Sequence, residues 1–551
     1  MHKKYFKFLK KYVTEIIVSL ISLSFSFWLM FSTFSYKNGS MLIATKAWSD
    51  FASHIPLIRS FSLGSNFPPQ YPIFPGEPIR YHYLFYFLVG MLEKAGLRID
   101  WALNLPSALF FTALMLIIYL LGKELFKSKA VGILSLIFFL FNGSLSFIEF
   151  FKLHPLSRST ISNIVMNNVF PSFGPYDGRI VSAFWNLNIY TNQRHLSLAL
   201  AILLLIVFFI TRFEIKRKKM PLYLILLSGI LVGILPLLHS SVFLMILAVL
   251  GILLILFNSQ RKSLFLILLL GFLLSLPRVL FLKDTATYLP HLQIGYLITN
   301  QLSAFYFLQY WFMNLGLSAI LIPIGFLFAN KLQKKIFLAF FSLFLIGNFF
   351  QFSIEMAGNH KFFNAFLIIG NMYSAFLLIK LWGKCKLFKP IVIIAIFCLI
   401  FSGIIDFFPI KNDGFMTVSD YPKNPDIQWI IKNTPKDAVF LNTSYVYDQA
   451  SLAGRKIFMG WPYFPWSLGY DTNLRGSIMK QMLGSQDKKK LCPLLSDNKI
   501  NYIEIDENSL NDPNLPKVSS ILQFSLISVY NNYQATYKIY SVSEICQNIA
   551  K

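Results

Sequence analysis

The sequence predicts a polytopic α-helical membrane protein that carries a small C-terminal extracytoplasmic α/β domain. The first observation is composition, because 55% of the 551 residues are hydrophobic, 58 are phenylalanine and only 14% are charged. The second is the recurrence of apolar runs of about 20 residues, the length that crosses the ~30 Å hydrocarbon layer of a bilayer. The third is the end of these runs near residue 410, beyond which Asp, Asn and Lys become frequent.

The apolar windows predict about eleven spans. These are 12–34, 101–122, 130–149, 195–212, 220–238, 240–257, 262–282, 302–329, 335–353, 361–380 and 388–409. The segment 81–94 is shorter and ends in charge, which favours an interfacial or re-entrant helix. The N-terminal MHKKYFKFLKK resembles the charged region of a signal peptide. The apolar run after it is too long for a signal peptide, so we expect an uncleaved first span.

The distribution of positive charge predicts the orientation of the spans. The net charge is +25, and much of it falls in short loops between apolar runs. The basic loops are 122–129, 212–219, 258–263, 330–335 and 380–389. Each follows an even-numbered predicted span, so the positive-inside rule places the N-terminus inside and the C-terminus outside. Charge used in this way favours a lipid bilayer and not nucleic acid as the partner.

This topology predicts two domains. Residues 1–409 form a transmembrane domain with a long first outer loop at 35–100, and residues 410–551 form the outer α/β domain. In the outer domain a helix–strand pattern occurs twice, and a hairpin is expected around Asn531 and Asn532. Cys492 and Cys546 either form a disulfide, if this domain is extracytoplasmic, or remain two thiols, and the sequence leaves both open.

Histidine is concentrated on the predicted outer side. Apart from His2, every histidine falls in an outer loop or at the outer end of a span, namely His54, His82, His154, His195, His239, His291 and His360. A histidine that faces lipid at the end of a span would be costly. We therefore expect His195, His239 and His360 to face a shared polar cavity.

Short outer stretches supply the candidate site residues. They are Asp50, His54 and Arg59 in WSDFASHIPLIRSF, Arg80 and His82 in RYHY, Arg194 and His195 in YTNQRHL, His239 in LLHSS, and His360 and Lys361 in NHKFFN. One acid together with several cations suits the binding of an anion beside a base, and phosphate favours Arg, Lys and helix N-termini. Each residue also has a plain structural interpretation: Asp50 as a helix cap, Arg194 and Lys361 as snorkelling cations, and His239 as a turn residue.

This layout resembles the GT-C superfamily of membrane glycosyltransferases. Members of that superfamily have a long first outer loop, an acidic residue soon after the first span, and often a soluble C-terminal domain outside. Asp50 matches the acid, although Phe51 follows it where many members carry a second acid. The stretches DFASHIPLI, RYHY, NHKFFN and AGRKIFMGWP also resemble a group of prokaryotic multi-pass proteins placed near this fold.

The resemblance implies an enzyme at the outer face of the cytoplasmic membrane. It would move a sugar, with inversion, from a polyprenyl-phosphate-linked donor to a hydroxyl of a glycan, lipid or protein acceptor. Asp50 would accept the acceptor's proton and His54 would orient Asp50 or bind the sugar. The residues expected to contact the donor are Arg59, Arg80, His82, Arg194, His195, His239, His360 and Lys361. No cofactor and no metal ligand is assigned, and because the second acid is absent a divalent metal is left open.

Other functions fit parts of the pattern. A transporter or flippase of lipid-linked glycans would use the same basic outer surface, but charge is scarce inside the predicted spans and the two halves show no repeat. A non-catalytic membrane scaffold would need only the outer domain. A polysaccharide polymerase or ligase is chemically close to the transferase. The chain lacks a glycine-rich phosphate loop and a His-Glu-x-x-His helix, which disfavours an enzyme that uses cytosolic nucleotide sugars.

Overall fold

The computed structural model describes residues 2–173, 178–285, 288–506, 513, 517–519, 522 and 526–547. The chain forms two compact units. Unit 1 comprises Met1–Thr33, Asn104–Asp284 and Leu289–Gly414, whereas unit 2 comprises Phe34–Leu103, Thr285–Tyr288 and Phe415–Lys551.

Unit 1 is built from helices. They are α1 (His2–Thr33), α4 (Ile99–Phe126, whose first residues belong to unit 2), α5 (Lys129–Leu140), α6 (Ser146–Leu153), α7 (Thr160–Val165), α8 (Asn188–Asn192), α9 (Arg194–Ile215), α10 (Leu222–Leu238), α11 (Ser240–Leu256), α12 (Arg261–Asp284), α13 (Ala304–Leu315), α14 (Ser318–Phe328), α15 (Lys331–Phe349), α16 (His360–Lys384) and α17 (Phe388–Lys411). Two short strands, β5 (His291–Leu292) and β6 (Phe350–Gln351), pair antiparallel.

A helix occurs within every predicted span, and the predicted helical membrane fold is confirmed. Among the described residues, seven helical segments are long and apolar enough to cross a bilayer, or eight if the bent pair α13 and α14 is one span. The helices α5, α10 and α11 are apolar but shorter. The predicted count of about eleven spans, and their orientation, stay predictions.

Two of the predicted spans are interrupted. The single helix expected over 130–149 is wrong, because α5 ends at Leu140 and the chain turns through Asn142 and Gly143 before α6 begins. The segment 302–329 is bent by 92° between α13 and α14. Gly316 lies at this bend with φ 54°, a left-handed conformation that suits glycine.

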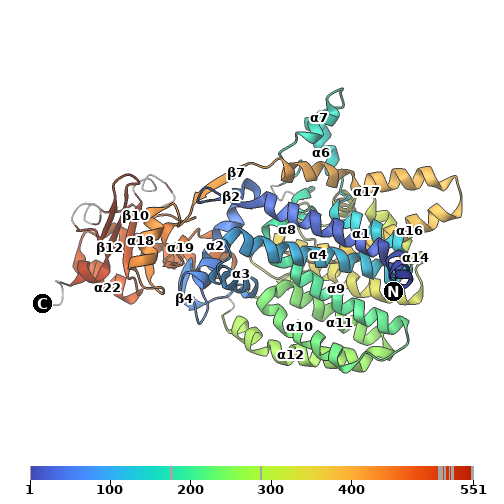
Figure 1. Cartoon of the computed structure of the whole chain (residues 1–551), viewed down its shortest axis with the longest axis horizontal. Coiled ribbons are helices and arrows are strands. Elements are labelled where there is room, and N and C mark those ends of the chain that lie inside the picture. The colour runs from blue at the N-terminus through green and yellow to red at the C-terminus, as the bar shows by residue number, and fades with distance from the viewer. Residues whose placement is uncertain are drawn as a thin grey trace. The chain divides into compact units, whose positions relative to one another are not determined.

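Close packing explains why α10, α11 and α12 lie side by side in unit 1 (Figure 1). A Cβ atom added to Gly233 of α10 would lie 2.5 Å from Leu274 Cβ of α12. A Cβ atom on Gly271 of α12 would lie 2.5 Å from Val232 of α10. The glycines therefore let two helix backbones approach closely, as small residues do between membrane helices.

Unit 2 combines two segments that are far apart in sequence. Its N-terminal part contains β1 (Phe34–Lys37), β2 (Ser40–Ala44), α2 (Trp48–Ser62), β3 (Gln70–Tyr71), β4 (Phe74–Pro78) and α3 (Leu84–Lys94). A later strand, β7 (Phe415–Ser419), joins β2 in an antiparallel sheet of order β1-β2-β7, in which Met41 lies opposite Val418. The predicted first outer loop thus shares a sheet with the residues that follow α17. The predicted helix at 81–94 is present as α3, within this unit.

The C-terminal part of unit 2 is the α/β structure that the sequence predicts. Its elements are α18 (Pro425–Asn433), β8 (Val439–Leu441), α19 (Gln449–Leu452), β9 (Lys456–Ile457), α20 (Tyr463–Ser467), α21 (Thr472–Gly484), α22 (Lys488–Asp497), β10 (Tyr502–Asp506), β11 (Tyr530–Asn532), β12 (Tyr537–Ser541) and α24 (Val542–Cys546). The strands form one sheet of order β11-β12-β10-β8-β9, and β10 and β12 lie side by side in Figure 1. The expected hairpin is present, but Asn531 and Asn532 lie in β11 and not in its turn.

The cysteine alternatives are resolved by the structure. Cys492 of α22 and Cys546 of α24 form a disulfide whose Cα atoms are 5.8 Å apart. Cys385 and Cys398 are free thiols.

Candidate functional site

The acid and the histidine that the sequence singles out lie on one helix of unit 2. Asp50 occupies the first turn of α2, where the helix dipole favours a negative charge. His54 follows one turn later and is 4% exposed, whereas Asp50 is half-buried. Their spacing of four residues puts both side chains on one helix face. The predicted pairing of acid and imidazole is therefore compatible with the helix that forms.

Four tyrosines of unit 2 lie near enough to Asp50 for its charge to raise their pKa values, and they are called here the tyrosine cluster. They are Tyr71, Tyr81, Tyr86 and Tyr447. Burial raises the pKa of each phenol, and the negative charge of Asp50 raises it further. Phenols with raised pKa values stay neutral at physiological pH and can donate hydrogen bonds. Residue patterns did not single out this cluster, because Tyr447 joins it from a segment more than 350 positions after the other three, which lie within residues 71–86.

The tyrosine cluster also holds the imidazole of His54. The His54 Nε2 atom lies 3.4 Å from the Tyr81 hydroxyl. The His54 ring stacks on the Tyr86 ring with centroids 4.6 Å apart. At the start of α2, the Tyr447 hydroxyl donates a hydrogen bond of 2.5 Å to the Trp48 carbonyl. This arrangement fixes the first two turns of α2, which carry Asp50 and His54.

Arg59 takes part in an internal ion-pair network of unit 2. It is 0% exposed, and its Nη2 lies 2.7 Å from Asp420 Oδ2 while its Nε lies 3.2 Å from Glu93 Oε1. Burial alone would lower the pKa of Arg59, but the charges of Glu93 and Asp420 raise it above its ordinary value. The two acids therefore balance its charge inside unit 2. This placement favours a structural role, and the donor contact expected for Arg59 stays a prediction.

Arg80 and His82 flank Tyr81 in the same unit. The guanidinium of Arg80 lies 2.6 Å from Glu77 Oε2 and stacks over the Tyr470 ring at 4.3 Å. It also donates a hydrogen bond to the Gly469 carbonyl. The His82 ring lies 3.9 Å from the Tyr81 ring and is half-buried. Both residues are thus placed beside the tyrosine cluster.

In unit 1, Arg194 joins three helices at the start of α9. Its guanidinium donates hydrogen bonds to the Asn104 side chain of α4, to Thr33 Oγ1 of α1 at 3.0 Å and to the Met30 carbonyl at 3.2 Å. A further bond of 3.1 Å goes to the Thr191 carbonyl. The side chain is 2% exposed. These bonds favour a structural role for Arg194 over the snorkelling alternative.

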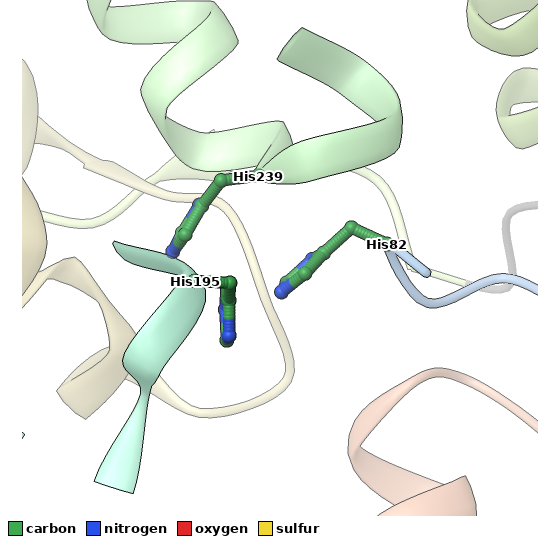
Figure 2. Close-up of side chains that lie close together, drawn as sticks. All are labelled: His82, His195 and His239. Carbon is green, nitrogen blue, oxygen red and sulfur yellow. The ribbon is translucent and has the colours of Figure 1, made fainter. Parts of the chain in front are cut away.

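The next residue, His195, lies against His239. Figure 2 shows the two imidazoles near each other, His195 at the start of α9 and His239 at the junction of α10 and α11. Their ring centroids are 5.2 Å apart, and both side chains are almost fully buried. Figure 2 also labels His82, which belongs to unit 2. Two imidazoles can supply two ligands to a metal, but protein zinc sites use three or four, so this pair alone does not complete one.

His360 and Lys361 open α16, as the sequence suggests. The His360 ring stacks on Phe184 with centroids 4.6 Å apart, and its Nδ1 lies 2.9 Å from the Ala357 carbonyl. Its Nε2 is buried and has no hydrogen-bond partner among the described residues. Lys361 is half-buried. The structure thus leaves one imidazole nitrogen of His360 available to a bound group.

Comparisons with known proteins agree with this fold. A family model described as "Uncharacterized membrane protein (DUF2298)" matches residues 19–176. No curated protein matches the chain. The Archaeoglobus fulgidus oligosaccharyltransferase in its apo form is similar over 90% of this chain and 70% of that chain, with 13% identity and a TM-score of 0.51. The same protein tethered with an acceptor peptide containing the NVT sequon is similar over 91% of this chain and 70% of that chain, with 12% identity and a TM-score of 0.50. The predicted membrane fold is thereby confirmed, and it is similar to the fold of this oligosaccharyltransferase.

Proposed function

We propose that this protein is a membrane glycosyltransferase that moves a sugar from a polyprenyl-phosphate-linked donor to an acceptor hydroxyl. The observation that carries the proposal is the position of Asp50. It opens the helix that follows the first predicted span, and it lies among neutral phenols in a chain with an oligosaccharyltransferase-like fold.

Asp50 is assigned the role of general base. It accepts the proton of the acceptor hydroxyl as the hydroxyl oxygen attacks the anomeric carbon, and the lipid phosphate leaves with the bonding electrons. General-base catalysis of this kind contributes about 10²–10⁴-fold. Attack opposite the leaving phosphate inverts the configuration of that carbon. His54, held by Tyr81 and Tyr86, is assigned to position the acid or the sugar.

The donor contacts are proposed separately for each unit. In unit 2, Arg80 and His82 are assigned to the donor because they flank Tyr81 in the sequence and the His82 ring contacts the Tyr81 ring. In unit 1, the residues proposed to contact the donor are Arg194, His195, His239, His360 and Lys361. Single substitutions, with donor binding as the measurement, test each of them. Cations that face a leaving phosphate stabilise the charge it develops.

The disulfide supports the proposed location of unit 2. Disulfides persist in oxidising compartments and are rare in the cytosol. The C-terminal part of unit 2 is therefore assigned to the outer face of the cytoplasmic membrane. The acceptor is assigned to the same side and is a glycan, a lipid or a protein. Turnover measured after chelation of divalent metals tests whether the reaction uses one.

The test follows release of lipid phosphate from a panel of labelled polyprenyl-phosphate sugars by the purified protein in nanodiscs. Asp50→Asn keeps the size of the side chain but removes the base. Asp497→Asn is the matched control, because Asp497 is an exposed acid at the end of α22 in the same unit. The proposal expects turnover to be lost in the first variant alone, with donor binding retained. Donor binding without turnover in the wild type would favour a flippase, and absence of donor binding would favour a scaffold.

A further inference from the structure

A separate pocket lies in unit 1, where one end each of α4, α9 and α15 meet. Its volume is about 540 Å³. The cations that line it are Lys127, Arg217, Lys331 and Lys335, and the carboxylate of Glu214 is the acid among the lining residues. None of these residues belongs to the candidate site described above.

The basic residues of this pocket come from three segments that are far apart in sequence. Lys127 follows α4, Arg217 follows α9, and Lys331 and Lys335 lie in the first turns of α15. The positive-inside rule explains why each of these segments is basic. It does not explain why they converge on one hollow. Convergence of four cations on a single pocket is the arrangement that binds an anion.

Some of these charges already have protein partners. Lys127 pairs with Glu124 at 2.8 Å, and Lys335 donates a hydrogen bond to the Leu256 carbonyl at 2.5 Å. The side chains of Arg217 and Lys331 are exposed, and within the described residues they make no ion pair or side-chain hydrogen bond. These two cations are therefore the ones available to a ligand.

The N-terminus of α15 adds to the positive potential. This helix has 19 residues, and Asn330 caps it by accepting a hydrogen bond of 3.0 Å from the Gln333 amide. The Gln333 side chain accepts a return bond of 2.8 Å from the Asn330 amide. The capping box uses the backbone amides of Asn330 and Gln333, and the backbone amides of Lys331 and Leu332 take no part in it. Amides of a first helical turn together with the helix dipole favour a negatively charged group.

We propose that this pocket binds the phosphate headgroup of an anionic membrane lipid. The helices α4, α9 and α15 are each long and apolar enough to span a bilayer, so their ends lie near a membrane surface. The pocket wall also contains Leu125, Phe126 and Ile215, which suit the upper part of an acyl chain. Basic pockets between transmembrane helices on the inner side attract anionic lipid headgroups. The proposal does not depend on the proposed transferase activity.

The test measures lipid retained by the purified full-length protein, using native mass spectrometry with phosphatidylglycerol or phosphatidylcholine. The double variant Arg217→Gln/Lys331→Gln removes the two available cations. The matched control is Lys384→Gln/Lys386→Gln, which removes two exposed cations near the end of α16. We expect the affinity for phosphatidylglycerol to fall about tenfold or more in the pocket variant and to stay unchanged in the control.

Three outcomes would overturn the proposal. Equal loss in both double variants would mean that the surface charge acts without a specific site. Equal binding of phosphatidylglycerol and phosphatidylcholine would remove the anionic headgroup from the argument. Binding of inorganic phosphate to the wild type, but not of phosphatidylglycerol, would identify a soluble anion as the ligand.

Discussion

At the scale of single residues, unit 2 contains a buried carboxyl pair that sets a pH dependence. Glu504 of β10 accepts a hydrogen bond from the Tyr537 hydroxyl, and Asp448 caps α19. Burial raises the pKa of both, to about 6 for Asp448 and well above the ordinary value for Glu504, where the nearby charge of Asp448 adds to the effect. Carboxyls with raised pKa values bind more protons in the folded state. The free energy of unfolding therefore falls as pH rises from about 4 through 6 and beyond.

Glu504→Gln tests this pair, because the amide keeps a hydrogen-bond acceptor for Tyr537 but carries no charge. We expect the melting temperature of the variant to exceed that of the wild type at pH 8, and the difference to shrink at pH 5. Thermal unfolding at several pH values is the measurement, and the exposed Asp497→Asn is the control. A difference in melting temperature that does not change with pH would contradict the raised pKa values of Glu504 and Asp448 as its cause.

Arg59 tests the ion-pair network in the same unit. Arg59→Gln leaves Glu93 and Asp420 buried without their cation, which costs about 3–5 kcal/mol. Arg98→Gln is the comparison, because the Arg98 side chain is 51% exposed in its pair with the buried Asp100, so solvent screens its charge more than that of Arg59. Unfolding in denaturant measures both. A smaller loss for Arg59→Gln than for Arg98→Gln would show that the buried network is not stabilising.

These residues mark the limit of sequence reasoning at this scale. The spacing of Asp50 and His54 was readable because α2 is a regular helix. The role of Arg59 could not be predicted in this way, because its partner Asp420 lies 361 positions away in the chain. The tyrosine cluster was missed for the same reason, because Tyr447 reaches Trp48 from a distant segment.

At the scale of elements, the apolar windows located helices but missed their interruptions. The signals were present in Asn142, Gly143 and Gly316, yet an apolar window averages over such residues. A break in a membrane helix is tolerated where the backbone is buried in protein. Here a Cβ on Gly316 would collide with the Gly143 carbonyl, so the two breaks pack on each other. Sequence patterns do not reveal such packing.

The α10–α12 contact gives a prediction at this scale. Gly233→Val places a side chain against Leu274, and overpacking of this kind costs about 1–3 kcal/mol. Gly251→Val in α11 is the matched control, because a Cβ there meets nothing within 4 Å. We expect a lower melting temperature in detergent for the first variant alone. Equal melting temperatures would show that α10 and α12 are not packed as described.

At the scale of the whole molecule, composition and hydropathy were enough to predict the fold class, since a chain with 55% hydrophobic residues has few other solutions. They could not predict that β2, from the first outer loop, pairs with β7, from beyond the last span. That pairing makes Phe34–Leu103 and Phe415–Lys551 parts of one unit. The residues assigned to catalysis are therefore carried by the same unit as the α/β structure.

The central claim is that Asp50 acts as the base of a glycosyl transfer. The most direct measurement is single-turnover release of lipid phosphate by the wild type and by Asp50→Asn, with donor binding measured on the same samples. The account predicts a rate lower by about 10²–10⁴-fold in the variant, with unchanged donor affinity. Equal rates in the two proteins would contradict it and would remove Asp50 from the mechanism.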